Sequence, residues 1–109
     1  MSTITPVFTP RLELPYQAIA SFCRRWGIVR LELFGSALRE DFDPTSDVDF
    51  MYVFAPGVKL GWEFSALCDE LEAIVGRHVD MISRKAVERS ANPRRKNEIL
   101  DSARVIYAE

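Results

Sequence analysis

The sequence predicts an α/β (α+β) fold in which helices cover a small mixed β-sheet. In some segments apolar and charged residues alternate, as in strands, and between them lie segments in which apolar residues recur every three or four positions, as in helices. The 109 residues suffice for one hydrophobic core. We expect a single domain over residues 15–109, preceded by an N-terminal arm over residues 1–14, where Pro6 and Pro10 accompany only weak periodicity.

The first half of the domain predicts one helix and two strands. The helix spans residues 15–26 and ends at Gly27, which suits a left-handed C-cap. Residues 28–34 alternate between apolar and charged side chains, which predicts a strand with one face in water. After turn-forming residues at 43–46, residues 48–54 form the second predicted strand.

The second half predicts a further strand between helices. A helix over residues 62–75 precedes a short third strand at 79–82. Ser83 and the pair Asn92-Pro93 suit the starts of a short helical segment and of a last helix. The pattern at residues 104–108 fits a helix or a strand equally well.

Composition is typical of a soluble, cytoplasmic domain. The chain is 48% hydrophobic and 28% charged, and its longest apolar stretches fall far short of the ~20 residues that a membrane helix requires. Cys23 and Cys68 are the only cysteines, and His78 is the only histidine, so we expect neither a disulfide framework nor a structural zinc. We assign His78 a structural or surface role.

Charge is distributed unevenly along the chain. The net charge of −2 gives no global signature of polyanion binding, and we expect no sequence-specific binding to nucleic acid. Residues 84–96, however, contain six basic residues and one acidic residue. This basic segment could contact a partner protein, a triphosphate or RNA, or it could form a solvated helix face, and the sequence leaves these alternatives open.

Three aspartates are the strongest candidates for chemistry. Asp47 and Asp49 are two residues apart at the start of a predicted strand, so both side chains leave the sheet on one face. Adjacent carboxylates repel one another unless a cation lies between them, and such hard oxygen ligands suit Mg²⁺. If the third strand neighbours the second, Asp80 joins this site, which could then hold two Mg²⁺ ions for phosphoryl transfer. We also place Tyr52 on this face, bordering a nucleotide.

A Gly-Ser turn supports this interpretation. Gly35-Ser36 follows the first strand and precedes a possible helical turn. Glycine lets the backbone approach a phosphate closely, and the serine hydroxyl and the free N–H groups of a helix start can bind phosphates. Arg39 could add a charge-assisted contact. Taken alone, an Asp-x-Asp pair is more often a solvent-exposed turn than a metal site, and a Gly-Ser pair is a common turn.

In combination these residues resemble a known family. Gly35-Ser36, ten intervening residues, Asp47-x-Asp49, and Asp80 within a strand are similar to the nucleotidyltransferase superfamily of DNA polymerase β, and above all to its minimal (MNT-type) members. The resemblance covers nearly the whole chain and is carried by the stretches LFGSALREDFDPTSDVDFMYVF, GRHVDMIS and NPRRKNEILDSARVIYA. It implies the DNA polymerase β-like nucleotidyltransferase fold.

The resemblance also implies roles for individual residues. Asp47 and Asp49 would bind both Mg²⁺ ions, and Asp80 would bind the catalytic ion and help to deprotonate the acceptor hydroxyl. The nucleotide would be bound by four further residues, Gly35, Ser36, Arg39 and Ser46. One departure from the family pattern is Glu40, which stands where members often have glycine directly after the arginine.

The implied reaction transfers AMP from ATP to a hydroxyl group and releases pyrophosphate. Minimal members are typically paired with a HEPN-domain ribonuclease, in a toxin–antitoxin system in which the MNT protein neutralises the toxin, in some cases by adding AMP to a tyrosine. We expect a protein adenylyltransferase that forms a hetero-oligomer with a HEPN toxin, which provides the acceptor surface. Two alternatives stay open: an antitoxin that acts by binding alone, and the catalytic subunit of an enzyme that modifies a small molecule.

Overall fold

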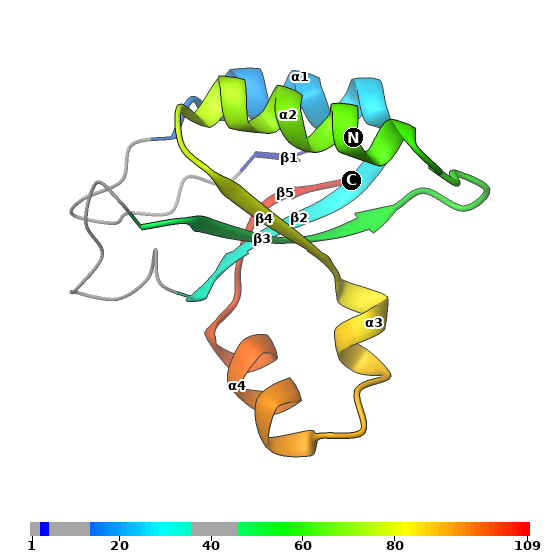
Figure 1. Cartoon of the computed structure of the whole chain (residues 1–109), viewed down its shortest axis with the longest axis vertical. Helices are drawn as coiled ribbons and strands as arrows, with labels where there is room; N and C mark the ends of the chain where they lie inside the picture. The colour runs from blue at the N-terminus through cyan, green and yellow to red at the C-terminus, as the bar shows by residue number, and fades with distance from the viewer. Residues whose placement is uncertain (1–2, 5–13, 36–45) are drawn as a thin grey trace.

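A mixed five-stranded sheet forms the centre of the molecule in the computed structural model, which describes residues 3–4, 14–35 and 46–109 (Figure 1). The strand order is β1-β5-β2-β3-β4, and neighbours are antiparallel except for β3 and β4, which are parallel. The strands are β1 (Thr3–Ile4), β2 (Ile28–Phe34), β3 (Val48–Phe54), β4 (Val79–Ser83) and β5 (Arg104–Ala108). The fold class expected from the sequence is confirmed.

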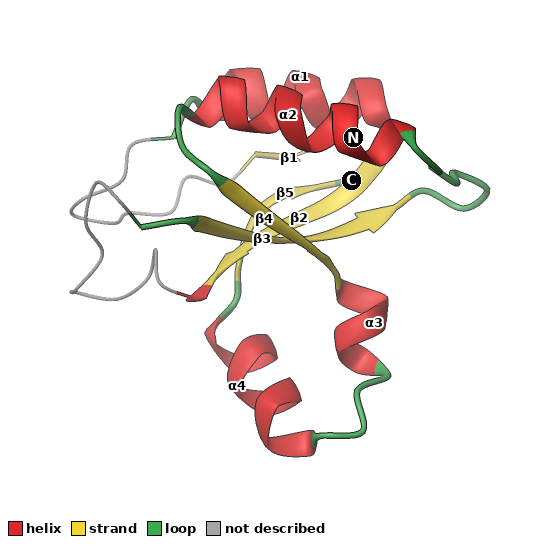
Figure 2. Ribbon diagram, in the orientation of Figure 1, coloured by secondary structure: helices red, strands yellow, loops and turns green. Residues whose placement is uncertain are grey.

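Helices lie on both sides of this sheet (Figure 2). In the described part of the chain they are α1 (Tyr16–Trp26), α2 (Glu63–Val75), α3 (Arg84–Glu88) and α4 (Pro93–Ser102). Helices α1 and α2 lie together across one face, and α3 and α4 lie on the opposite side, where β4 leads into α3 (Figure 1). None of the described helices is long and apolar enough to cross a bilayer.

The main hydrophobic core lies between the sheet and helices α1 and α2. Alternate residues of the central strands enter it: Leu31 and Leu33 from β2, and Val48 and Phe50 from β3. Each of these side chains is fully buried, and burial of a side chain of this size stabilises a fold by about 1.5–3 kcal/mol. Because strand residues alternate between faces, the intervening residues of β3 and β4 lie on the side of α3 and α4.

The C-terminal segment, which fits a helix or a strand by sequence, forms β5. It lies inside the sheet between β1 and β2, and its residues Ile106 and Tyr107 are fully buried. Its partners are far away in sequence, as the pairing of Leu31 with Tyr107 shows. Within the segment predicted as an N-terminal arm, Thr3–Ile4 pairs with β5 and Leu14 is buried, while the domain boundary at residue 15 stays a prediction.

The two helices on the second side begin at the caps that the sequence indicates. The Ser83 hydroxyl accepts a hydrogen bond from the Ala86 N–H at the start of α3. The Asn92 side chain accepts one from the Arg95 N–H at the start of α4, where Pro93 occupies the first turn. These bonds satisfy backbone donors that a helix start leaves without an internal partner, so both boundaries are locally encoded.

The expectation that one face of β2 is in water is wrong at Glu32. This carboxylate is 2% exposed, and it is the one charged side chain that is buried among the described residues. It forms ion pairs with Arg84 at the start of α3 and with Arg30 on its own strand, the latter at 2.9 Å. A buried carboxylate requires such partners, and the pair thereby fastens α3 to the sheet.

We therefore predict that Arg84→Ala lowers the free energy of unfolding by about 3 kcal/mol, because it leaves the buried Glu32 short of its main partner. Denaturant-induced unfolding followed by circular dichroism measures this change. The control is Arg94→Ala, since Arg94 is 90% exposed and its one ion pair within the described part of the chain is with Glu98 on the surface. Its removal should cost less than about 0.5 kcal/mol. Equal, small effects of the two substitutions would contradict the prediction.

Candidate active site

The parallel pairing of β3 and β4 places the candidate carboxylates on one face of the sheet. Asp49 lies directly opposite Asp80 in the register of the two strands, and Asp47 precedes β3 by one residue. Their strand neighbours Val48 and Val79 are buried in the core on the other face. The condition set by the sequence, that the third predicted strand neighbours the second, is thus met.

Two of the three carboxylates converge directly, together with a histidine. Asp47, His78 and Asp80 each offer a ligand atom, and these atoms all lie within 4.8 Å of one another on an exposed surface. The carboxylate of Asp49 is not part of this group. It lies alongside, next to Gly35 at the end of β2.

His78, which was assigned a structural or surface role from the sequence, lies beside two of the candidate carboxylates. Its Nδ1 is 2.6 Å from Oε2 of Glu72 in α2, and its Nε2 is 3.5 Å from Oδ1 of Asp80. The same Glu72 oxygen accepts a hydrogen bond from the Val79 N–H at 2.9 Å. A signal was present in the sequence, because His78 is two residues before Asp80 and alternation puts both on one face.

These contacts shift the ionisation of both partners. Desolvation is the largest single influence on His78 and lowers its pKa, but the negative charges of Asp47, Glu72 and Asp80 and the hydrogen bond to Glu72 together outweigh it, so the pKa is raised. The pKa of Glu72 is lowered, first by the hydrogen bond from the Val79 N–H and then by His78. The arrangement therefore favours an ionised carboxylate beside the imidazole.

Gly35 leaves no space for a side chain beside the Asp49 carboxylate. Its φ of +75° is in the left-handed region, and a Cβ atom there would lie 2.5 Å from Oδ2 of Asp49. No other residue can occupy this position without displacing the carboxylate. Ser36 and Arg39 lie outside the described residues, and the nucleotide-binding role of Ser46, whose carbonyl faces Arg77, stays a prediction.

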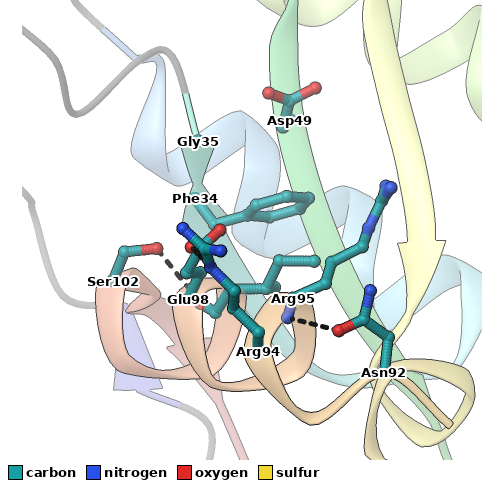
Figure 3. Close-up of a pocket in the computed structure, with 9 residues that line it drawn as sticks. Phe34, Gly35, Asp49, Asn92, Arg94, Arg95, Glu98 and Ser102 are labelled. Atoms are coloured by element: carbon teal, nitrogen blue, oxygen red, sulfur yellow. Dashed lines mark hydrogen bonds and ion pairs between the residues drawn. The ribbon is translucent and has the colours of Figure 1, made fainter. Parts of the chain in front are cut away.

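A pocket of about 600 Å³ opens beside Asp49, between the end of β2 and α4 (Figure 3). Phe34, Gly35 and Asp49 form one side of it, and Arg94 and Arg95 extend from α4 on the other. Part of the basic segment 84–96 thus lines a cavity next to the carboxylates. Arg84 of the same segment instead forms an ion pair with the buried Glu32.

The structure excludes Tyr52 from the site and places Cys23 in the core. Tyr52 is three residues after Asp49, so it lies on the opposite face, where it packs against Phe64 of α2; its placement beside a nucleotide was wrong. Burial raises the pKa of the Cys23 thiol to about 12, which leaves it un-ionised at neutral pH and unsuited to nucleophilic attack. Cys23 is fully buried in the core.

The donor set fits a divalent cation. Asp47 and Asp80 supply the carboxylate oxygens that Mg²⁺ prefers, and their exposure leaves room for water and substrate phosphates in the remaining positions. Asp49 lies on the same face within the adjoining pocket.

Comparison with known proteins identifies the family of this chain. The family model described as "Nucleotidyltransferase domain" matches residues 16–106. The chain belongs to this family.

The similar proteins include minimal members of the family. A Methanocaldococcus jannaschii protein whose name proposes protein adenylyltransferase activity is 32% identical over 75 residues, which cover 69% of this chain and 80% of that protein. A solved structure described as a minimal nucleotidyltransferase is 31% identical, with a TM-score of 0.63, and the match covers 82% of this chain and 86% of that one. A third match shows likeness of fold at 18% identity and a TM-score of 0.57, covering 86% of this chain and 70% of that one. It is a complex of a tri-AMPylated Shewanella oneidensis HEPN toxin with its MNT antitoxin.

For this nucleotidyltransferase we predict that Gly35→Ala lowers nucleotidyl transfer at least about tenfold, because the added Cβ displaces the Asp49 carboxylate. Gly57→Ala is the matched control. Gly57 also has a left-handed backbone (φ +87°), but a Cβ there meets nothing within 4 Å. Both variants should lose about 1 kcal/mol of stability from backbone strain. Transfer rates and unfolding curves are measured for both variants. Equal transfer activity of the two variants would contradict the prediction.

Proposed function

We propose that this nucleotidyltransferase transfers AMP from ATP to a hydroxyl group of a partner protein, and that it acts as the antitoxin of a HEPN-domain ribonuclease toxin. The observation that carries the proposal is the convergence of Asp47 and Asp80 across the β3–β4 pair, beside a pocket large enough for a nucleotide. The adenylyltransferase name of one relative and the AMPylated HEPN toxin bound to an MNT antitoxin in another support the choice of AMP and of the partner.

The reaction needs a divalent cation, and we propose two Mg²⁺ ions bound by Asp47, Asp80 and Asp49. Held by these carboxylates, the ions would neutralise the charge that develops on the triphosphate and would make the acceptor hydroxyl easier to deprotonate. Asp80, exposed at the open side of the site, accepts the proton of the hydroxyl as its oxygen attacks the α-phosphorus. One phosphate ester bond forms, the bond between the α- and β-phosphates breaks, and pyrophosphate leaves.

Arg95 is the residue of the basic segment best placed to contact the nucleotide. It lines the pocket that contains Asp49, and among the described residues no carboxylate forms an ion pair with its guanidinium. Arg94, by contrast, is paired with Glu98. We therefore assign Arg95 to the phosphates of ATP, where a guanidinium forms charge-assisted hydrogen bonds. The Phe34 ring and Ile99 provide apolar surface in the same pocket.

Arg95→Ala is expected to raise the KM for ATP about tenfold, because it removes one charge-assisted hydrogen bond that contributes roughly 1.5 kcal/mol. Steady-state kinetics at varied ATP concentration measures it. Arg89→Ala is the control, since Arg89 is an exposed residue of the same basic segment outside the pocket, and its KM should stay within twofold. An unchanged KM with weakened binding of the partner protein would instead assign Arg95 to the protein interface.

The proposed function is tested with α-labelled ATP, Mg²⁺ and an extract of the protein's own host. We expect label on one protein band that mass spectrometry identifies as a HEPN-domain protein. Asp47→Asn should reduce labelling by about 10²–10³-fold, because it removes charge that holds the cation. Asp69→Asn, at an exposed position of α2 outside the metal-ligand group, should have no effect.

The same experiment separates the alternatives. Toxin neutralisation that survives Asp47→Asn without any labelling would indicate an antitoxin that acts by binding alone. Label that appears only in a low-molecular-weight product would indicate an enzyme that modifies a small molecule. Either result would overturn the proposed transfer to protein.

A further inference from the structure

The histidine beside the carboxylates lies close enough to them to share a cation. His78 is the only histidine of the chain, and its side chain is 62% exposed at the start of β4. Its Nε2 is 3.5 Å from Asp80, and its ligand atom lies within 4.8 Å of those of both Asp47 and Asp80. Donors that share one cation at bonds of about 2.1 Å lie about 3–4 Å apart, so small rotations of these exposed side chains suffice to bind one ion.

Glu72 sets the orientation of the imidazole. It accepts a hydrogen bond from the Val79 backbone and faces Nδ1 of His78 at 2.6 Å. A carboxylate at Nδ1 holds a proton on that nitrogen, so Nε2, on the side of Asp80, is the nitrogen that a cation would bind in place of a proton. Histidines that ligate metals almost always have such a carboxylate or carbonyl partner at the other nitrogen.

We propose that His78 supplies an imidazole nitrogen to the cation held by Asp47 and Asp80, and that this mixed nitrogen–oxygen site binds Mn²⁺ more tightly than Mg²⁺. Mg²⁺ favours carboxylate and water oxygens, whereas Mn²⁺ accepts the same oxygens and is higher in affinity for nitrogen-containing sites. Glu72 is the positioning residue of the site. The inference concerns the metal site of the proposed function, but it is tested by binding and not by transfer.

The first measurement is a titration of tag-free protein with MnCl₂ alone, without nucleotide, in which free Mn²⁺ is followed by electron paramagnetic resonance. We expect His78→Asn to weaken Mn²⁺ binding at least about tenfold, and Glu72→Gln to weaken it about tenfold through loss of orientation. Competition with MgCl₂ should show that His78→Asn changes Mg²⁺ affinity less than about threefold. Asp69→Asn, which removes a carboxylate from the same helix away from the cluster, should leave both affinities unchanged.

The second measurement is pulsed electron paramagnetic resonance of the Mn²⁺-loaded wild-type protein. An imidazole nitrogen coupling is expected, and because the chain has one histidine, it can arise only from His78. Bound Mn²⁺ without this coupling, tighter binding of Mg²⁺ than of Mn²⁺, or unchanged Mn²⁺ affinity in His78→Asn would each overturn the inference. Since neither readout requires AMP transfer, failure of the inference is distinguishable from failure of the proposed function.

Discussion

The parallel pairing of β3 and β4 is the constraint on which the site depends. A parallel pair requires a crossover, and here α2 provides it by packing across the core face. The register of the pair places Asp49 opposite Asp80 and brings Asp47 to the same end. If either strand shifted by one residue in this register, its carboxylates would point into the core. The burial of Val48, Phe50 and Val79 therefore also fixes the face on which the aspartates lie.

The crossover helix α2 also contacts the residues around the candidate metal site. Glu72 near its C-terminal end accepts the Val79 N–H where β4 begins and faces the His78 imidazole. The carbonyl of His78 in turn accepts a hydrogen bond from the Val48 N–H of β3. One short segment thus links α2, β3 and β4 at the point where the candidate ligands meet.

The opposite side of the sheet contributes the pocket. The ion pair of Glu32 with Arg84 fixes the start of α3, and α4 follows after a short turn. This position of α4 brings Arg95 near Asp49, although the two residues are 46 positions apart. A buried charge within the sheet therefore stabilises the wall of a cavity on its surface.

Local sequence patterns predicted most of the helices and strands. They did not predict the features that depend on contacts between residues far apart in the sequence. Asp47-x-Asp49 and the caps at Ser83 and Asn92 depend on neighbours in sequence, so they could be interpreted without a structure. The strand β5 and the burial of Glu32 depend on partners far along the chain, which a local pattern does not contain. The contact of His78 with Glu72 joins two elements and is likewise absent from a local pattern. Tyr52 was misplaced although alternation alone puts it on the other face.

The adjoining ends of β3 and β4 are proposed to bind a metal ion and a nucleotide together. The most direct measurement is a crystal structure of the protein with Mn²⁺ and a non-hydrolysable ATP analogue, with the metal located by its anomalous scattering. We expect an anomalous peak between Asp47 and Asp80, with the phosphates of the analogue beside it and Arg95 in contact with them. Metal and analogue bound elsewhere, or an analogue bound with no metal at these carboxylates, would contradict it.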